Sequence, residues 1–583
     1  MLFFMHHGRG SRSERSERET WDSGAHRCRR KDATADCDPD GNPFGYLFDA
    51  EDTPTHTASQ IKQLANEITA NAVEPAERDS NLPPVFTYLS QFIDHDLTAN
   101  TDRDTSLSEI GPEDADLTPL PRDKVLCFLG NLRKGSLGLD SVYGDGPELS
   151  LTPEQQEVVQ KLQSAMRWMS GPFVGKLRLA RPGSKSHQGA VDIPLPADDG
   201  IQAADLLRLG NIIGELISAD DLRKLPNEMA KIFFVDETLN EPQKARAIIG
   251  DMRNDENLIV AQLQTAFIRL HNVIVDWLRS QGMAEDDLFS EARELVRYHY
   301  QWLVLNVFLP TICNKHIVQR AINNAAPLYT QFLKQFDGVS HASMPMPLEF
   351  SVAAYRYGHS MIRESYDYNR NFGLEANAAP ELTFREAFQF TGGGGLNGVN
   401  DGNLPADLLI EWVRYVMPIA SQPQPSGKTP RRAARKIDSH LNFELNNMVN
   451  EENVGVFQRL AERNLRRAQR LNVGTGQQLF KALGSSAYSD LIEAVDTSEI
   501  MPPFDNQTPL WLYVLKEAEK KGGDRLGSVG SAIVADTLVG LVINDPKSYW
   551  QVKGSQWHPR DGAKPNGFEL SSLENLFCAT GQI

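Results

Sequence analysis

Gln91, Asp94 and His95 are the first residues of the chain whose types and spacing could do chemistry together. At positions i, i+3 and i+4 of a helix, an amide, a carboxylate and an imidazole share one face. The sequence from Pro83 to Thr98 predicts this helix, because proline is tolerated in a first helical turn. An imidazole can take up and release a proton near neutral pH. A lone histidine on a packed helix is more often a satisfied core residue, so the motif needs partners elsewhere.

A second pair of charged residues precedes a long apolar segment. Arg253 and Glu256 are three residues apart, and the run from Leu258 to Leu278 follows them. Apolar residues recur in this run at helical spacing, which predicts a long amphipathic helix. Taken alone, a surface ion pair near a helix start would be the commoner explanation of the Arg–Glu spacing.

Two later segments add a histidine and an amide. His359 follows Gly358, and a glycine lets a flat ligand approach the backbone closely. The stretch from Leu460 to Gly476 predicts a helix that ends before its closing glycines. Asn464 and Arg467 lie one turn apart on this helix.

These segments, taken in chain order, resemble the haem peroxidases first described in animals, within the peroxidase-cyclooxygenase superfamily. The four segments are QFIDHD at Gln91 to Asp96, GDMRNDEN at Gly250 to Asn257, YRYGHS at Tyr355 to Ser360 and LAERNL at Leu460 to Leu465. Members of the bacterial, peroxicin-like branch are nearest in character. The resemblance implies a mainly α fold, in which a large single helical domain over residues 41–583 has few short strands and buries haem between central helices. Residues 1–40 are predicted to be a disordered tail, because they contain too few aliphatic side chains to form a core.

The resemblance also assigns roles on the peroxide-binding side of the haem. His95 would take a proton from H₂O₂ and return it to the other oxygen as the O–O bond breaks. Arg253 matches the distal arginine, whose permanent cation stabilises the charge that develops on the departing oxygen. Gln91 matches the distal glutamine, which hydrogen-bonds water or substrate above the iron.

On the opposite side of the haem, His359 resembles the proximal iron ligand. Asn464 would accept the other ring N–H of this histidine and so fix its orientation. Arg356 and Arg467 match arginines expected near the haem propionates.

Asp94 and Glu256 match the two carboxylates that form ester bonds to haem methyl groups in animal members. The resemblance therefore implies haem b that is covalently linked through both residues, in a reaction driven by peroxide. Asn257 stands where the leukocyte enzyme has a methionine, so no sulfonium link is expected and strong chloride oxidation is in doubt. Bromide, iodide, thiocyanate or phenols are the expected reductants.

The family's calcium site is only partly present. Asp96, Ser136 and Asp140 are candidate calcium ligands, since hard cations prefer oxygen donors. Lys134 and Gly138 stand where the family loop usually supplies threonine and aspartate. Two alternatives stay open: a calcium ion binds here, or the Lys134 ammonium replaces it electrostatically.

Composition excludes some classes of protein. The chain of 583 residues has a formal net charge of −18, which opposes binding to nucleic acid or to an acidic membrane surface. No apolar stretch reaches the roughly 18 uncharged residues of a transmembrane helix. The start, MLFFMHHGRG, lacks a basic region ahead of its short apolar run, so we expect a soluble protein that is cytoplasmic or is exported without a signal peptide. The five cysteines favour reduced thiols, although Cys28 and Cys37 could pair.

The predicted activity is that of a haem peroxidase, which reduces H₂O₂ and oxidises halides, thiocyanate or small aromatic donors through the intermediate called Compound I. One alternative is a fatty-acid dioxygenase of the same superfamily. Such an enzyme needs a radical-forming tyrosine three residues before the proximal histidine, and Arg356 occupies that position. Another alternative is a non-enzymatic haem protein ligated by both His95 and His359, which would leave Arg253 without a purpose. The sequence predicts no oligomeric state.

Overall fold

The computed structural model describes residues 29–32, 37, 41–70, 78–99, 109–144, 151–193, 204–234, 237–374, 380–398, 402–421, 432–448 and 455–583. Hydrophobic side chains from Phe44 to Ala579 pack into one continuous core, and a second, smaller cluster runs from Val158 to Met252. Helices dominate the described residues and strands contain two to four residues each, which confirms the predicted mainly α fold.

The elements have the following bounds. The α-helices are α1 (Ala58–Thr69), α2 (Val85–Leu97), α3 (Arg122–Phe128), α4 (Asp140–Tyr143), α5 (Pro153–Ala165), α6 (Ala219–Arg223), α7 (Asn227–Phe233), α8 (Glu241–Lys244), α9 (Leu258–Ser280), α10 (Leu288–Leu303), α11 (Leu309–Ile312), α12 (Lys315–Asn323), α13 (Pro327–Leu333), α14 (Leu348–Ser351), α15 (Phe384–Gln389), α16 (Val413–Val416), α17 (Leu460–Arg470), α18 (Gly476–Leu483), α19 (Leu510–Lys520), α20 (Ser528–Asn544), α21 (Tyr549–Val552) and α22 (Leu573–Ala579). The strands form pairs or triplets: β1 (Arg29–Arg30) with β6 (Phe336–Asp337), β2 (Asn42–Gly45) between β3 (Gly130–Asn131) and β7 (Met346–Pro347), β4 (Leu179–Ala180) with β5 (Asp205–Leu206), and β8 (Ser365–Tyr366) with β9 (Leu382–Thr383).

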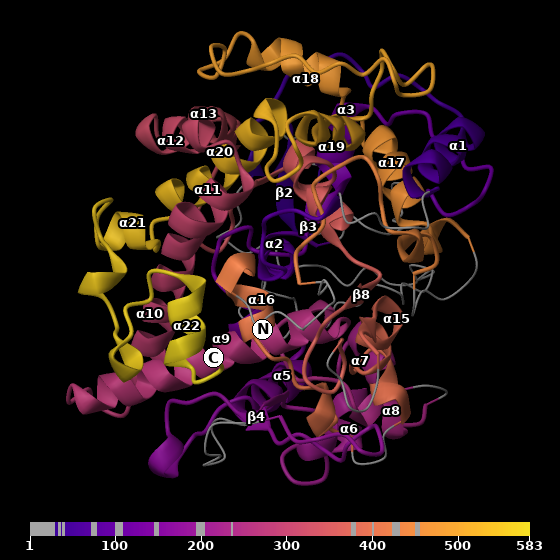
Figure 1. Ribbon diagram of the computed structural model, residues 1–583. Coiled ribbons are helices and arrows are strands. Elements are labelled where there is room, and N and C mark those ends of the chain that lie inside the picture. Colours follow the sequence, from indigo (N-terminus) through magenta and orange to yellow (C-terminus); the bar gives the residue numbers. More distant parts are fainter. Residues whose placement is uncertain are drawn as a thin grey trace.

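Helix α9 is the long central helix of the core, and Figure 1 shows it running below α2. The side chain of Asn257 caps its start by accepting a hydrogen bond from Ile259 N at 2.9 Å. Helix α9 packs against α2, α10 and the 3₁₀ turn η4 (Met252–Asp255). By length and composition it could cross a membrane, but its apolar window is fully buried inside the protein, which is typical of a core helix.

Helix α2 confirms the helix predicted from Pro83 to Thr98. Pro84 stands at its N-cap, and the Phe92 ring stacks on Phe267 of α9 with centroids 4.8 Å apart. Every residue of α2 is buried except Gln91 and Asp94, which are partly exposed. The polar face of the helix is therefore the one that the core leaves accessible.

His359 lies on a 3₁₀ segment, η6 (Ala354–Met361), that packs directly against α2. Ser90 Oγ of α2 donates to Tyr357 Oη of η6 at 3.0 Å. A Cβ atom at Gly358 would lie 3.6 Å from Ser90 Oγ, which is ordinary van der Waals contact, so Gly358 lies directly against α2. The segments that carry the two predicted haem histidines are thus neighbours.

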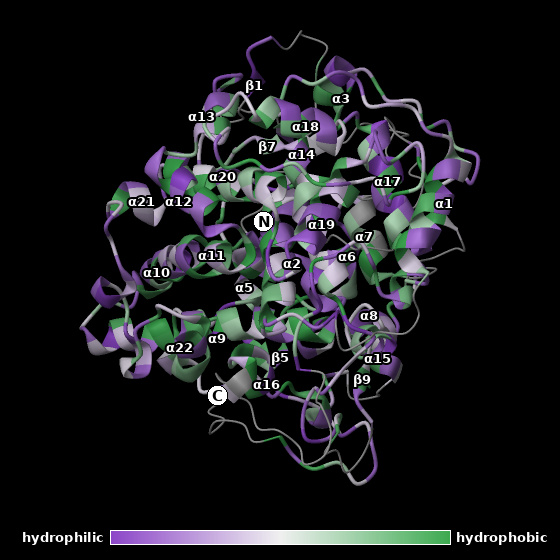
Figure 2. Cartoon of the chain, turned by 45° about the horizontal axis from the view of Figure 1, so that its top comes forward, coloured by the Kyte–Doolittle hydropathy of each residue, from purple (hydrophilic) through white to green (hydrophobic). Residues whose placement is uncertain are grey.

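Helices at the periphery have one hydrophobic and one hydrophilic side. Figure 2 shows both kinds of residue on α1, whose buried side includes Ile61, Leu64 and Ile68. Such a helix covers the core with its apolar side and faces solvent with the other.

The N-terminal region differs in part from the prediction. Most of the expected tail, including Cys28, lies outside the described residues, but Arg29–Arg30 pairs with β6 and Cys37 forms a disulfide with Cys127 of α3. The prediction of reduced thiols is therefore wrong for Cys37 and Cys127, whereas the boundary at residue 40 stays a prediction. Sequence spacing could not show the pairing, because 90 residues separate the two cysteines.

The disulfide predicts a stability difference. Replacing both Cys37 and Cys127 by serine should lower the free energy of unfolding by about 2–5 kcal/mol, because the bond restricts the unfolded chain. Denaturant unfolding measures this loss, and a non-reducing digest should contain a peptide that joins the two cysteines. Free alkylation of both thiols in the native protein would contradict the pairing. The partly exposed Cys578, which forms no disulfide, is the control for access of the reagent.

Candidate active site

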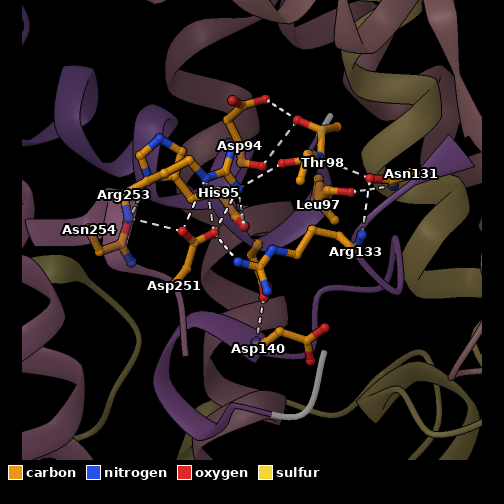
Figure 3. Close-up of polar contacts among 12 residues, drawn as sticks. Asp94, His95, Leu97, Thr98, Asn131, Arg133, Asp140, Asp251, Arg253 and Asn254 are labelled. Atoms are coloured by element: carbon orange, nitrogen blue, oxygen red, sulfur yellow. Dashed lines mark hydrogen bonds and ion pairs between the residues drawn. The ribbon is translucent and has the colours of Figure 1, made fainter. Parts of the chain in front are cut away.

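His95 is buried in the core, and one nitrogen of its ring has a defined partner. His95 Nδ1 lies 2.6 Å from Asn254 Oδ1 (Figure 3). Asn254 Nδ2 donates to Gln264 Oε1 of α9 at 2.9 Å, and Gln264 Nε2 donates to the carbonyl of Ser141 at 2.9 Å. These contacts form a continuous chain from the imidazole to the backbone of α4.

This chain determines which nitrogen of His95 carries the proton. The Ser141 carbonyl can only accept, so Gln264 must present its N–H to Ser141 and its oxygen to Asn254. Asn254 in turn presents its N–H to Gln264 and its oxygen to His95. Nδ1 therefore donates its proton, and Nε2 is the unprotonated nitrogen, whose lone pair can act as a base.

The environment also keeps His95 neutral. Burial, followed by the positive charge of Arg253, lowers the pKa of His95 to about 3. The ring is consequently uncharged at neutral pH, and a proton taken up by Nε2 leaves readily again.

Arg253 is held beside His95 by a buried carboxylate. Its guanidinium contacts both carboxylate oxygens of Asp251, at 2.7–3.1 Å, and donates to the carbonyls of His95 and Thr98 at 3.1 and 2.8 Å (Figure 3). Asp251 also pairs with Arg133, and the two arginines hold the pKa of the Asp251 carboxyl below its usual range against the opposing effect of burial.

Hydrogen bonds to Asp255 hold the turn that carries Arg253 and Glu256. Asp255 accepts from Arg208 Nη1 at 2.9 Å and from the backbone N–H of Gly392 at 3.1 Å. A Cβ atom at Gly392 would lie 2.1 Å from Asp255 Oδ2, so only glycine fits this contact.

On the other side of the site, His359 faces Asn464 of α17. Asn464 Nδ2 and His359 Nδ1 are 3.0 Å apart. The two ends of an amide have the same shape, so rotation by 180° places Oδ1 where it accepts from Nδ1–H, and Nε2 is then the nitrogen with the lone pair that can bind a metal. Arg356 and Arg467 are both buried near this end of the molecule's core.

The two predicted ester residues lie on the two elements that flank the site. Asp94 of α2 is partly exposed and accepts from Thr98 Oγ1 at 2.8 Å. Glu256 is buried directly before α9. Asn257, which replaces the methionine of the leukocyte enzyme, is the N-cap of α9.

Asp96 points away from these groups. Its Oδ2 accepts from Leu139 N at 3.0 Å and its Oδ1 accepts from Asp140 N at 2.6 Å, so it binds the start of α4. Burial and the neighbouring Asp140 raise the pKa of Asp96 above its ordinary value.

The residues on both sides of the site fit haem. An imidazole with a partnered Nδ1 is the usual ligand of haem iron, and two buried guanidinium groups suit two propionate carboxylates. Ser90 faces η6, and Asp94 is four residues further along α2, so the Asp94 carboxylate lies on the same face of the helix. A separate cavity of about 320 Å³, lined by residues such as Lys185, His187 and Glu386, contains none of the predicted haem residues.

The animal haem peroxidase family model matches residues 201–400 of this chain, a segment that includes Arg253, Glu256 and His359. Over this segment the chain is similar to the animal haem peroxidases. Human lactoperoxidase is 21% identical over 352 residues, a match that covers 58% of this chain and 44% of that protein. The chain spans less than half the length of the curated relatives it matches.

Solved structures show the same fold at low identity. Peroxidase A from Dictyostelium discoideum has a TM-score of 0.51 and 14% identity, and the match covers 96% of this chain and 97% of that one. The fatty acid alpha-dioxygenase of Oryza sativa has a TM-score of 0.52 and 13% identity, with coverages of 93% and 82%. These matches show that the chain shares its overall fold with both proteins.

Three residues around His95 and Arg253 were missed by the sequence analysis: Asp251, Asn254 and Gln264. Asp251 and Asn254 flank Arg253 within the GDMRNDEN motif, so their position next to a predicted site residue was an available signal. Nothing in the sequence pointed to Gln264, because it lies among apolar residues of a core helix.

The hydrogen bond between His95 and Asn254 can be tested with a pair of variants. Asn254→Leu keeps the volume but removes the acceptor, so the haem-loaded protein should react with H₂O₂ about 10²-fold more slowly, a typical size for general base catalysis. Asn254→Asp keeps an acceptor and adds a negative charge, so it should retain most of the rate while the pKa of His95 rises.

Stopped-flow measurements from pH 4 to 8 would check both variants. Protonated His95 cannot act as a base, so the Asp variant should lose rate at a higher pH than the wild type as pH falls. Equal rates in the wild type and Asn254→Leu would show that Asn254 does not orient His95.

Proposed function

We propose that this chain is a haem peroxidase that reduces H₂O₂ and oxidises small donors. The observation that carries the proposal is the buried, neutral His95 whose Nδ1 donates to Asn254, which leaves Nε2 as a base. The match of residues 201–400 to the animal haem peroxidase family model supports haem as the cofactor.

His95 is proposed to move one proton. Nε2 takes the proton from one oxygen of H₂O₂ and then delivers it to the other oxygen, which leaves as water. Bound haem would supply the electrons that cleave the O–O bond, and the reducing substrate would replace them. Burial supports this role, because an imidazole with a low pKa returns its proton readily.

Arg253 is proposed to stabilise the negative charge on the departing oxygen. Its guanidinium is permanently charged and is fixed by Asp251 and two carbonyls, so it needs little reorganisation during the reaction. The partly exposed amide of Gln91 would hydrogen-bond the incoming peroxide or a water.

His359 is proposed as the iron ligand, with Asn464 as the acceptor of its Nδ1–H. This acceptor raises the donor strength of the ring and fixes its plane. Arg356 and Arg467 would bind the propionates.

Asp94 and Glu256 are proposed to bond covalently to the haem. Each carboxylate oxygen would bond to a methyl carbon, with loss of two electrons and a proton, and peroxide is the oxidant. The hydrogen bond from Thr98 to Asp94 holds one of the two carboxylates in place.

The reductants that we propose are bromide, iodide, thiocyanate or small phenols. Asn257 caps α9 and cannot form a sulfonium link, which leaves chloride as a poor substrate. We also propose the bacterial, peroxicin-like branch as the nearest part of the family.

Two alternatives are less well supported. The shared fold with a fatty acid alpha-dioxygenase does not supply a tyrosine in register with His359, since Tyr357 is two residues away and its hydroxyl accepts from Ser90. In a bis-histidine haem protein, the buried ion pair of Arg253 with Asp251 beside His95 would have no catalytic purpose.

His95→Ala should slow the reaction of the haem-loaded protein with H₂O₂ by about 10²–10⁴-fold, because the proton shuttle is lost. His271→Ala is the matched control. His271 of α9 is also buried, and burial lowers its pKa to about 3, but its partners are the Tyr143 hydroxyl and the Gly175 carbonyl. Stopped-flow spectroscopy should show a normal rate for this control. A normal rate in His95→Ala would refute the assignment.

The covalent link is tested by solvent extraction. After turnover with peroxide, acidic organic solvent should leave haem on the wild-type chain and remove it from the double variant Asp94→Ala, Glu256→Ala. Mass spectrometry of the intact chain measures the retained haem. Complete extraction from the peroxide-treated wild type would be the contrary result, and Thr98→Val, which keeps both carboxylates, is the control.

A further inference from the structure

The loop from Lys134 to Asp140 has too few available oxygen atoms for a calcium ion. Calcium takes six to eight oxygen ligands. In this loop the carbonyls of Ser136, Leu137 and Gly138 already accept hydrogen bonds, from Gly138 N, from Gln301 Nε2 at 3.0 Å and from Arg297 Nε at 2.7 Å respectively.

Among the other candidate oxygen ligands, several already accept hydrogen bonds and few remain. Both oxygens of Asp96 accept backbone N–H groups of α4, and the carbonyl of Lys134 accepts from Met344 N at 2.8 Å. The buried side-chain oxygens in this loop that accept no hydrogen bond among the described residues are Ser136 Oγ and the two carboxylate oxygens of Asp140. Groups of three or more histidine, cysteine or acidic side chains that could hold a metal ion do not occur within the described ranges.

Asp140 nevertheless needs a cation. Its side chain is completely buried, and a buried carboxylate without a counter-charge is strongly unfavourable. The ammonium nitrogen of Lys134 lies 3.9 Å from Asp140 Oδ1, and the Lys134 side chain is only 15% exposed.

Gly138 lies close to the side chains of Asp140 and Ser136. A Cβ atom at this position would lie 3.3 Å from both Asp140 Oδ1 and Ser136 Oγ, so a side chain here would point at the two groups that lack hydrogen bonds. Glycine therefore stands at a loop position from which a further carboxylate could reach them.

We propose that the Lys134 ammonium is the permanent counter-ion of Asp140, that it stands where a calcium ion would otherwise bind, and that the protein folds and holds His95 without calcium. The cluster bears on the active site through Asp96, which follows His95 on α2 and binds the start of α4. The inference does not depend on peroxidase activity, and metal content and unfolding measure it directly.

The test compares the full-length wild type with three variants, each dialysed against calcium chloride or against EGTA. Wild type should contain no calcium above the buffer blank, and its Tm should be the same in both solutions. Lys134→Arg should behave in the same way because it keeps a cation. Lys134→Met should have a lower Tm, because Asp140 is left buried without a counter-charge.

The double variant Lys134→Thr, Gly138→Asp removes the ammonium and adds a carboxylate and a hydroxyl. It should bind about one calcium per chain and gain Tm in calcium relative to EGTA, as expected for a site with enough hard oxygen ligands. Folding of this variant only in calcium would give the same support. Stoichiometric calcium in the wild type, a fall in its Tm in EGTA, an unchanged Tm in Lys134→Met, or no effect of calcium on the double variant would each overturn the proposal.

Discussion

The hydrogen bond from His95 Nδ1 to Asn254 Oδ1 is the interaction on which the proposed chemistry depends. It joins α2, which carries the distal residues, to the turn that carries Arg253 and Glu256. Since Asn254 is itself fixed through Gln264 to the Ser141 carbonyl, the direction of every hydrogen bond in the chain follows from one backbone acceptor. A neutral imidazole with a defined tautomer is the result.

The buried charged residues around this series of hydrogen bonds form ion pairs that fix the positions of their side chains. Asp251 binds both Arg133 and Arg253, and Asp255 binds Arg208. Breaking a buried pair by removing one partner is costly, so these contacts specify a single arrangement of the turn. The same logic applies to Asp140 and Lys134 on the other side of α4. The turn that carries Arg253 and the loop from Lys134 to Asp140 are therefore both attached to α4. Asp96 accepts the N–H of Asp140 at the start of this helix, and Gly250 N donates to the carbonyl of Ser141 within it.

Part of this organisation could be predicted from the sequence and part could not. The helices that carry His95 and Asn464 were predictable because helical spacing and proline or glycine boundaries are local signals. The order of the four motifs indicated the family. The Cys37–Cys127 bond, the link between His95 and Asn254 and the partners of the Asp140 loop were not predictable, because they join residues that only the fold brings together. Hydrogen-bonding amides such as Gln264 have no periodic signature, and a core helix hides them among apolar neighbours.

The central claim is that His359 alone ligates the iron while His95 stays free as a base. The absorption and electron paramagnetic resonance spectra of the haem-loaded wild type, recorded before and after H₂O₂ is added, test it most directly. The account predicts a high-spin ferric haem with one axial histidine, whose spectrum changes within seconds of peroxide addition. A low-spin spectrum with two imidazole ligands that does not respond to peroxide would contradict it.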